Sequence, residues 1–247
     1  MENNRIASFA WPIAVVLIVG ISAIAFLKTL DKGESIAGKF SSQQIKTTFA
    51  EHLAAVRATD GNILQVGVVE STEILRREDT MKLFGDLFEV GKTVTEIRVP
   101  AVYKFEINLD EKWDVNSQIS AQNSVLLIIA PSIKPSLPVA FDSERMEKFV
   151  QEDLLRFNAA EQMQALEKEI TPTLNRLAAQ KIDLVRDKAR LAVAKFAQNW
   201  LLREQQWDAK KFSVIAVHFQ DEFGSIGEMQ RQHVPLVPTL RLQKTAE

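Results

Sequence analysis

The sequence contains no cysteine, which excludes disulfide bonds, thiolate zinc sites and cysteine nucleophiles. It has no surplus of basic residues either. The net charge of −2 gives no field that would attract nucleic acid, and no basic surface with interleaved aromatic residues could stack single strands. A glycine-rich phosphate loop, a G-x-S-x-G motif and the histidine spacing of a metal site are also missing. We therefore predict no catalytic residues, no cofactor, no metal and no nucleic-acid partner, and a protein that is not an enzyme.

A long apolar run stands near the start of the chain. Residues 6–27, IASFAWPIAVVLIVGISAIAFL, carry no charge and are long enough to cross a hydrocarbon core of about 30 Å as a helix. Trp11 lies near one end, where interfacial aromatic residues are common. A cleaved signal peptide is the alternative, because Ala23-Ile24-Ala25 offers a small-x-small site. We predict an uncleaved single-pass anchor in the lipid bilayer, preceded by a short tail, 1–5.

The charges beside the anchor bear on its orientation. Arg5 precedes it, and Lys28, Lys32 and Lys39 follow it. Counting basic residues alone favours a cytoplasmic C-terminal side. The difference is small, so the side of the membrane on which the rest of the chain lies stays open.

Residues 28–61 are predicted to form a juxtamembrane linker and an amphipathic helix, which ends at Asp60-Gly61. Its apolar stripe is Ile45, Phe49, His52, Leu53 and Val56, at helical spacing. His52 on this stripe is typical of a boundary histidine and not of a ligand.

Strands are predicted over 62–141. From Ile97 to Leu109 every odd residue is apolar and most even residues are polar, which indicates one buried face and one solvated face. The continuous run SVLLIIA, 124–130, indicates a strand covered on both faces. Three prolines, Pro131, Pro135 and Pro138, then require an extended connection.

Three local features qualify these strands. Gly67 indicates a bulge or a close approach of another segment. Residues 76–79, RRED, are predicted to form a charged turn. Pro100 lacks a hydrogen-bond donor, so we expect it at a sheet edge or a bulge.

From residue 142 the apolar period changes from 2 to about 3.6, which predicts helices over 142–206. The expected stripe includes Met146, Phe149, Val150, Leu154 and Phe157, and a break or kink is expected at Thr171-Pro172. A last strand is predicted at 211–220 and a flexible tail at 224–247. The predicted fold class is α+β: one domain, 62–223, in which a mixed or antiparallel β-sheet packs against long α-helices.

Charge is distributed unevenly along the predicted helices. Residues 144–169 include seven acidic and four basic residues, whereas residues 171–206 include seven basic and three acidic residues. One interpretation is a basic helix that touches anionic lipid or an acidic partner. The other is a pair of solvated faces whose opposite charges draw the helices together.

His218 is the one histidine with acid–base potential, because Asp221 and Glu222 follow it closely. A cleft that unites His218 with Asp221, Glu222, Asp110 or Glu111 would indicate an enzyme. No nucleophile or metal spacing accompanies it, so a histidine satisfied within a sheet is the simpler interpretation. His233 lies in the predicted tail and carries no signal.

The order of these parts resembles a known family. An anchor is followed by YKFEINLDEKWDV (103–115), VLLIIAPSIKPSLPVAFD (125–142), a long charged helical stretch and KFSVIAVHF (211–219). This resembles the bacterial single-pass membrane family classed as the domain of unknown function numbered 4230, over roughly residues 60–220. Phe105 and Glu106 stand where that family has a glycine before its "-iDL-" segment. The resemblance implies the same architecture and a place in the bacterial inner membrane, and it brings no catalytic residues. A looser likeness in layout is to membrane-scaffold proteins of the stomatin and prohibitin type.

Two classes of function follow. The first is a membrane-anchored, non-catalytic binding or scaffold module that acts through the 143–206 helices, by self-association or with a protein partner. The second is a membrane-tethered enzyme with a carboxylate/His218 site. Exposed apolar residues on the helices would favour the first class.

Overall fold

The computed structural model describes residues 43–83, 88–119, 124–153, 157–203 and 212–242. The predicted tail 1–5, the predicted membrane helix 6–27 and the linker up to residue 42 lie outside these ranges. Within them, no helix combines the length and the hydropathy that crossing a bilayer requires. Two compact units, 1–50 and 51–247, are distinguished. Residues 43–60 are helical, and Ile45, Phe49 and Leu53 are buried, which confirms the predicted amphipathic stripe.

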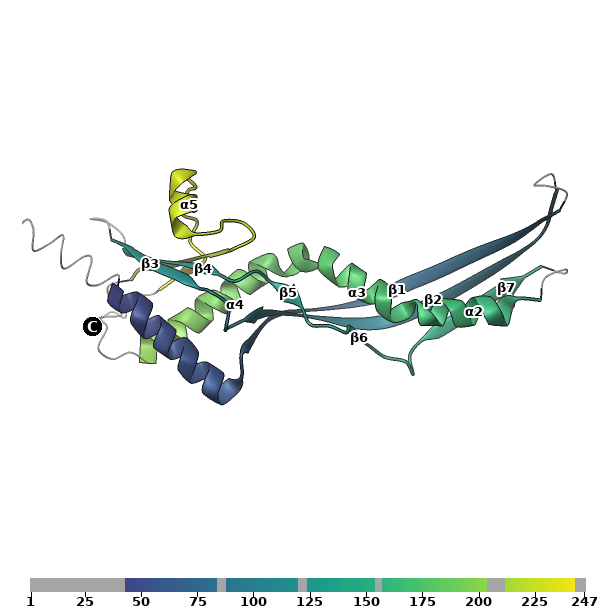
Figure 1. The fold of residues 1–247 in the computed structure, drawn as a ribbon, viewed down its shortest axis with the longest axis horizontal. Coiled ribbons are helices and arrows are strands. Elements are labelled where there is room, and N and C mark those ends of the chain that lie inside the picture. Colours follow the sequence, from purple (N-terminus) through teal and green to yellow (C-terminus); the bar gives the residue numbers. More distant parts are fainter. Residues whose placement is uncertain (1–42, 84–87, 120–123, 154–156, 204–211, 243–247) are drawn as a thin grey trace, which may run out of the picture. The chain divides into compact units, whose positions relative to one another are not determined.

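The second unit is a mixed α+β structure built on a long hairpin (Figure 1). Strand β1 (Ile63–Leu83) pairs antiparallel with β2 (Phe88–Asn108) along their whole lengths. The predicted charged turn at 76–79 is therefore wrong, because β1 continues through it. Both faces offer the charges a partner: Arg76 binds Glu78 on the outer face, and Arg77 reaches Glu169 on the inner face.

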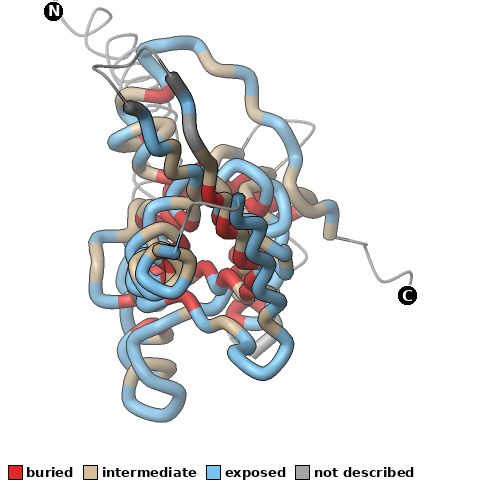
Figure 2. The backbone as a smooth tube through the Cα atoms, turned by 90° about the vertical axis from the view of Figure 1, so that its right-hand side faces the viewer, coloured by how far each residue is buried: buried red, intermediate tan, exposed pale blue. Residues whose placement is uncertain are grey.

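The inner face of β2 is the centre of the core. All seven odd positions predicted to be buried are at most 2% exposed: Ile97, Val99, Ala101, Tyr103, Phe105, Ile107 and Leu109. In Figure 2 the buried segments of the chain, in red, gather towards the centre, and exposed segments surround them. The alternating pattern therefore placed this strand and its buried face correctly, because every second side chain of a strand points to the same side.

Three short strands pair in succession along the other edge of β2: β5 (Lys134–Pro135), β6 (Ala140–Phe141) and β7 (Glu147–Glu152). This makes β2 a central strand, so Pro100 is not on an edge strand. It lies opposite the gap between β6 and β7, where its carbonyl accepts a hydrogen bond from the Asp142 N–H. A residue without a donor is tolerated there because no ladder bond is lost.

The prediction of helix from residue 142 is wrong for its first part. Residues 147–152 form β7, and all six of its residues are exposed, including Phe149 and Val150. Their spacing suits a helix stripe, but the open edge of β2 satisfies the backbone of this segment as a strand. Leu154 lies outside the described residues, and Phe157, 90% exposed, precedes the first helix.

Three helices then run nearly end to end: α2 (Ala159–Lys168), α3 (Ile170–Gln180) and α4 (Ile182–Arg203). Single residues interrupt them, Glu169 and Lys181. The first break lies close to the predicted kink at Thr171-Pro172, whereas the second was not predicted. The helices cover the inner face of the hairpin with one buried stripe: Leu166, Ile170, Leu174, Ala178, Val185, Ala189, Val193 and Trp200.

A second sheet, in the order β3-β4-β8-β9, corrects the prediction of a single sheet. It contains β3 (Asp114–Ile119), β4 (Ser124–Ala130), β8 (Val214–Phe219) and β9 (Leu240–Arg241). Strand β4 pairs parallel with β8, while the other pairs are antiparallel. Residues 126–130 are fully buried, which confirms that this apolar run is covered on both faces. Strand β8 lies within 211–220, the range predicted for a last strand, although β9 follows it in the chain.

Residues 224–242 contain a helix and a strand, so the predicted flexible tail at 224–247 is wrong for the part that the structure describes. Helix α5 (Ile226–Arg231) begins at Ser225, whose side chain accepts a hydrogen bond from the Glu228 N–H. Ile226 and Met229 pack in one apolar cluster with Leu127, Ile129 and Ala216 of the second sheet. A short apolar pair with an N-cap is enough to order a segment when a sheet face needs covering.

Gly67 fulfils both interpretations of its role. The β1–β2 register shifts between Gln65 and Gly67, and a Cβ atom on Gly67 would lie 3.0 Å from Val185 Cβ and 3.1 Å from Val185 Cγ1. Such contacts are tighter than nine in ten of those that real Cβ atoms make, so the absence of a side chain at Gly67 lets α4 approach β1 without displacing Val185.

We expect Gly67→Ala to lower the free energy of unfolding by about 1–3 kcal/mol, because the added methyl group overpacks the contact with Val185. Urea denaturation measures this. Gly227→Ala is the matched control, since its nearest atom would be Ser225 Oγ at 3.9 Å. That variant should be neutral or slightly stabilising. Val185→Ala should recover part of the loss in the double variant, and strict additivity would contradict the steric explanation.

Candidate functional site

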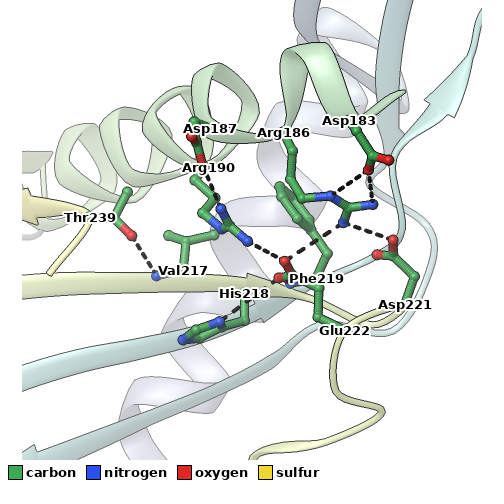
Figure 3. Close-up of polar contacts among 10 residues, drawn as sticks. All are labelled: Asp183, Arg186, Asp187, Arg190, Val217, His218, Phe219, Asp221, Glu222 and Thr239. Atoms are coloured by element: carbon green, nitrogen blue, oxygen red, sulfur yellow. Dashed lines mark hydrogen bonds and ion pairs between the residues drawn. The ribbon is translucent and has the colours of Figure 1, made fainter. Parts of the chain in front are cut away.

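The candidate site centres on the turn that follows β8, where helix α4 lies against the second sheet (Figure 3). Arg186 and Arg190 stand one turn apart on α4, and both reach Glu222. Arg186 also binds Asp221, with 2.8 Å between its Nη1 atom and Asp221 Oδ2. Sequence spacing placed Asp221 and Glu222 beside His218 but did not predict the two arginines.

Glu222 is held from several sides. Its Oε1 atom accepts from Arg190 Nη2 and lies 3.8 Å from Arg186 Nη1, and its Oε2 atom accepts from the Phe219 N–H at 3.0 Å. Its side chain is only 19% exposed. The carboxylate therefore closes the turn after β8 and ties this turn to α4.

Each arginine is also held by its own helix. Asp183 and Asp187 stand three residues before Arg186 and Arg190 and bind them at 3.2 and 2.6 Å. Burial alone would lower the pKa of Arg186, but hydrogen bonding and charge from Asp221 and Asp183 outweigh it and raise the pKa. Both guanidinium groups are thus held between carboxylates of their own helix and of the turn after β8.

His218 is 9% exposed and packs edge-on against Phe223, with ring centroids 5.3 Å apart. Its Nδ1 atom lies 3.8 Å from Glu222 Oε2, beyond hydrogen-bond distance, and its Nε2 atom finds no hydrogen-bond partner in the described part of the chain. Burial lowers the pKa of His218, Glu222 opposes this and Arg190 adds to it. The imidazole is therefore neutral near pH 7. It lies in the sheet as predicted, but its Nε2 atom is not satisfied by any of the described residues, which differs from the histidine expected from the sequence.

The other two acids of the predicted set are engaged elsewhere. Asp110 accepts hydrogen bonds from Asn62 and Arg57, and these two partners lower the pKa of its carboxyl group. Glu111 binds Lys134. Of the predicted residues, the structure joins only His218, Asp221 and Glu222.

A second polar cluster was missed by sequence analysis. Lys181, at the break between α3 and α4, binds Glu73 of β1 at 2.9 Å and lies over the Tyr103 ring, 5.1 Å from its centroid. Burial alone would raise the pKa of Glu73, but Lys181 outweighs it and lowers the pKa. Burial, with the charge of Glu73, raises the pKa of Tyr103. Glu73 therefore stays ionised and Tyr103 stays neutral at pH 7, so the cluster orients the helix break and offers no proton to transfer.

The remaining candidates are structural or solvated. His52 packs against Phe196, and His233 is exposed with its Nδ1 atom 3.0 Å from the Arg231 carbonyl. An open cleft of about 460 Å³ lies beside Pro100 and is lined also by Thr72, Arg98 and residues 144–147. None of the candidate residues lines it. Among the described residues, no group of three histidines and carboxylates could hold a metal ion.

Comparisons with protein-family models, with curated proteins and with solved structures find no match for this chain. The resemblance to the family numbered 4230 therefore stays a prediction.

We expect Glu222→Gln to lower the free energy of unfolding by about 1–3 kcal/mol, because it leaves two partly buried arginines without their shared anion. The amide oxygen can still accept from the Phe219 N–H. Asp187→Asn is the matched control, because Asp187 also binds Arg190 but is 94% exposed. This variant should lower the free energy of unfolding by less than about 0.5 kcal/mol. Equal losses in the two variants would show that the network does not stabilise the turn.

The lowered pKa of His218 also predicts a pH effect. Between the ordinary pKa of 6.5 and the lowered one, the unfolded chain binds a proton that the folded chain rejects, so folding stability falls as pH decreases. Above 6.5 this contribution is complete. We expect His218→Leu to reduce the loss of stability between pH 7.5 and 5, measured by urea denaturation. An unchanged pH profile would contradict a buried neutral imidazole.

Proposed function

We propose that this chain is a single-pass protein of the bacterial inner membrane, anchored by residues 6–27, whose folded domain binds other proteins and does not catalyse a reaction. The apolar run supports the anchor, because its 22 uncharged residues are more stable in lipid than in water. The resemblance stated above supports the location.

The observation that supports binding is an unpartnered stretch of α4. Leu184 and Leu191 are 66% and 38% exposed, on the side of the helix away from its buried stripe. Apolar side chains left at the surface of an otherwise well-buried helix mark an interaction site when they share one face. This is the feature by which sequence analysis distinguished a scaffold from an enzyme.

The basic character of the 171–206 segment supports this proposal less than its composition indicated. Lys181, Arg186 and Arg190 are engaged in ion pairs with Glu73, Asp221 and Glu222. These charges hold helices to strands, which differs from both interpretations made from the sequence. Lys188 and Lys195 remain exposed for an outside partner.

No observation favours the alternative, a membrane-tethered enzyme with a carboxylate/His218 site. The two carboxylates beside His218 are neutralised by arginines, and its ring is buried next to Phe223. A general base needs access to its substrate, which this arrangement does not offer.

Membrane fractionation tests the anchor. We expect the full chain to stay in the membrane pellet after a carbonate wash and to dissolve only in detergent, whereas a chain without residues 6–27 should be found in the supernatant. A mature N-terminus beginning after Ala25 would contradict the anchor and show a cleaved signal peptide.

Photocrosslinking tests the binding surface. A photoreactive residue at position 184 or 191 of the membrane-bound chain should form protein adducts several-fold more often than one at Glu70, an exposed residue of β1. Equal yields at the three positions would contradict a binding role for α4.

A further inference from the structure

The solvent face of α4 has a regular composition. Leu184 and Leu191 are seven residues apart, which is close to two helical turns, so they lie one above the other. Val185, Ala189 and Val193 are buried on the opposite side. The leucines therefore run along the middle of the exposed face.

The two sides of this leucine stripe carry opposite charges. At 100° per residue, Lys188 and Lys195 lie on one flank, and Asp183 and Asp187 lie on the other. Both aspartates are strongly exposed, 85% and 94%, although each also binds an arginine of its own helix. Arg190, near the acidic flank, is neutralised by Asp187 and Glu222.

This arrangement distinguishes two ways of pairing the helix with a copy of itself. In an antiparallel pair related by a two-fold axis, like flanks meet, so lysines face lysines and aspartates face aspartates. In a parallel pair, the acidic flank of one helix meets the basic flank of the other, and equivalent leucines meet in the centre. Only the parallel arrangement pairs opposite charges.

We propose that α4 binds α4 of a second copy of this chain, parallel and in register, through Leu184, Leu191 and the charged flanks. This inference rests on the proposed function, since an anchor holds all copies in one membrane with the same orientation. Two leucines per helix make a smaller contact than a stable soluble dimer needs. Tethering in a membrane raises the effective concentration enough for such a contact to form.

The absence of cysteine gives a direct test on the full chain in membranes. We expect Leu184→Cys and Leu191→Cys, each alone, to form disulfide-linked dimers under mild oxidation, because equivalent positions lie within disulfide reach only in the parallel pair. The dimer fraction should exceed that of Glu70→Cys, an exposed β1 position, several-fold. Urea denaturation confirms that each variant is folded.

Two results with the single-cysteine variants would overturn the proposal. One is a dimer yield no higher than that of Glu70→Cys. The other is a higher yield from a mixture of Leu184→Cys and Leu191→Cys chains than from either alone, which would show an antiparallel pair.

A charge reversal tests the flanks. In the Leu191→Cys background, Lys188→Glu with Lys195→Glu should reduce the dimer yield several-fold, and an unchanged yield would contradict the charge pairing. Fractionation of the same samples separates the failures: a chain in the membrane without dimers contradicts only this inference, and a chain outside the membrane contradicts the proposed function.

Discussion

The close contact of helix α4 with both sheets is the constraint on which the rest of the folded unit depends. Val185 of this helix packs against Gly67 of β1, and the same helix lies against β8 of the second sheet. Its buried side carries small residues, Ala189, Ala194 and Ala197, which allow a short distance to the strands. Because a protein interior is close-packed, a change in this contact would move both sheets.

Ion pairs hold α4 in this contact. The least exposed ion pairs between carboxylates and Lys or Arg in the described residues join helix to strand or turn. They are Lys181 with Glu73 at the start of α4, and Arg186 and Arg190 with Asp221 and Glu222 beyond β8. Fixing a helix with partly buried ion pairs specifies its position more than it adds stability, because desolvation offsets much of the attraction. The same pairs engage the two acids beside His218, because Asp221 and Glu222 already bind arginines of α4.

The exposed side of α4 has a different character. Where the buried side is small and closely packed, the outer side presents two leucines between lysines and aspartates. The proposed anchor at the N-terminus and the proposed association face on α4 are consistent with each other, since both fit a protein that gathers in a membrane.

Local periodicity predicted much of this structure. The alternation from Ile97 to Leu109, the apolar run 124–130, the extended proline segment and the last strand are each determined by which side chains can be buried together within one element. The mixed α+β class follows from the same patterns. The predicted membrane anchor and the resemblance also come from the sequence alone, and the apolar run 6–27 lies outside the described residues.

Tertiary structure decided the rest. Residues 147–152 have a spacing that suits a helix, and they form a strand because the edge of β2 is available. Residues 76–79 have the composition of a turn, but they form a strand in which the charges find partners within β1, across the hairpin and at the break between α2 and α3. The split into two sheets, the break at Lys181, the arginines around Glu222 and the order of the C-terminal segment all depend on contacts between residues far apart in the chain. No short-range pattern contains that information, since it specifies which face of an element is apolar and not which other element will cover it.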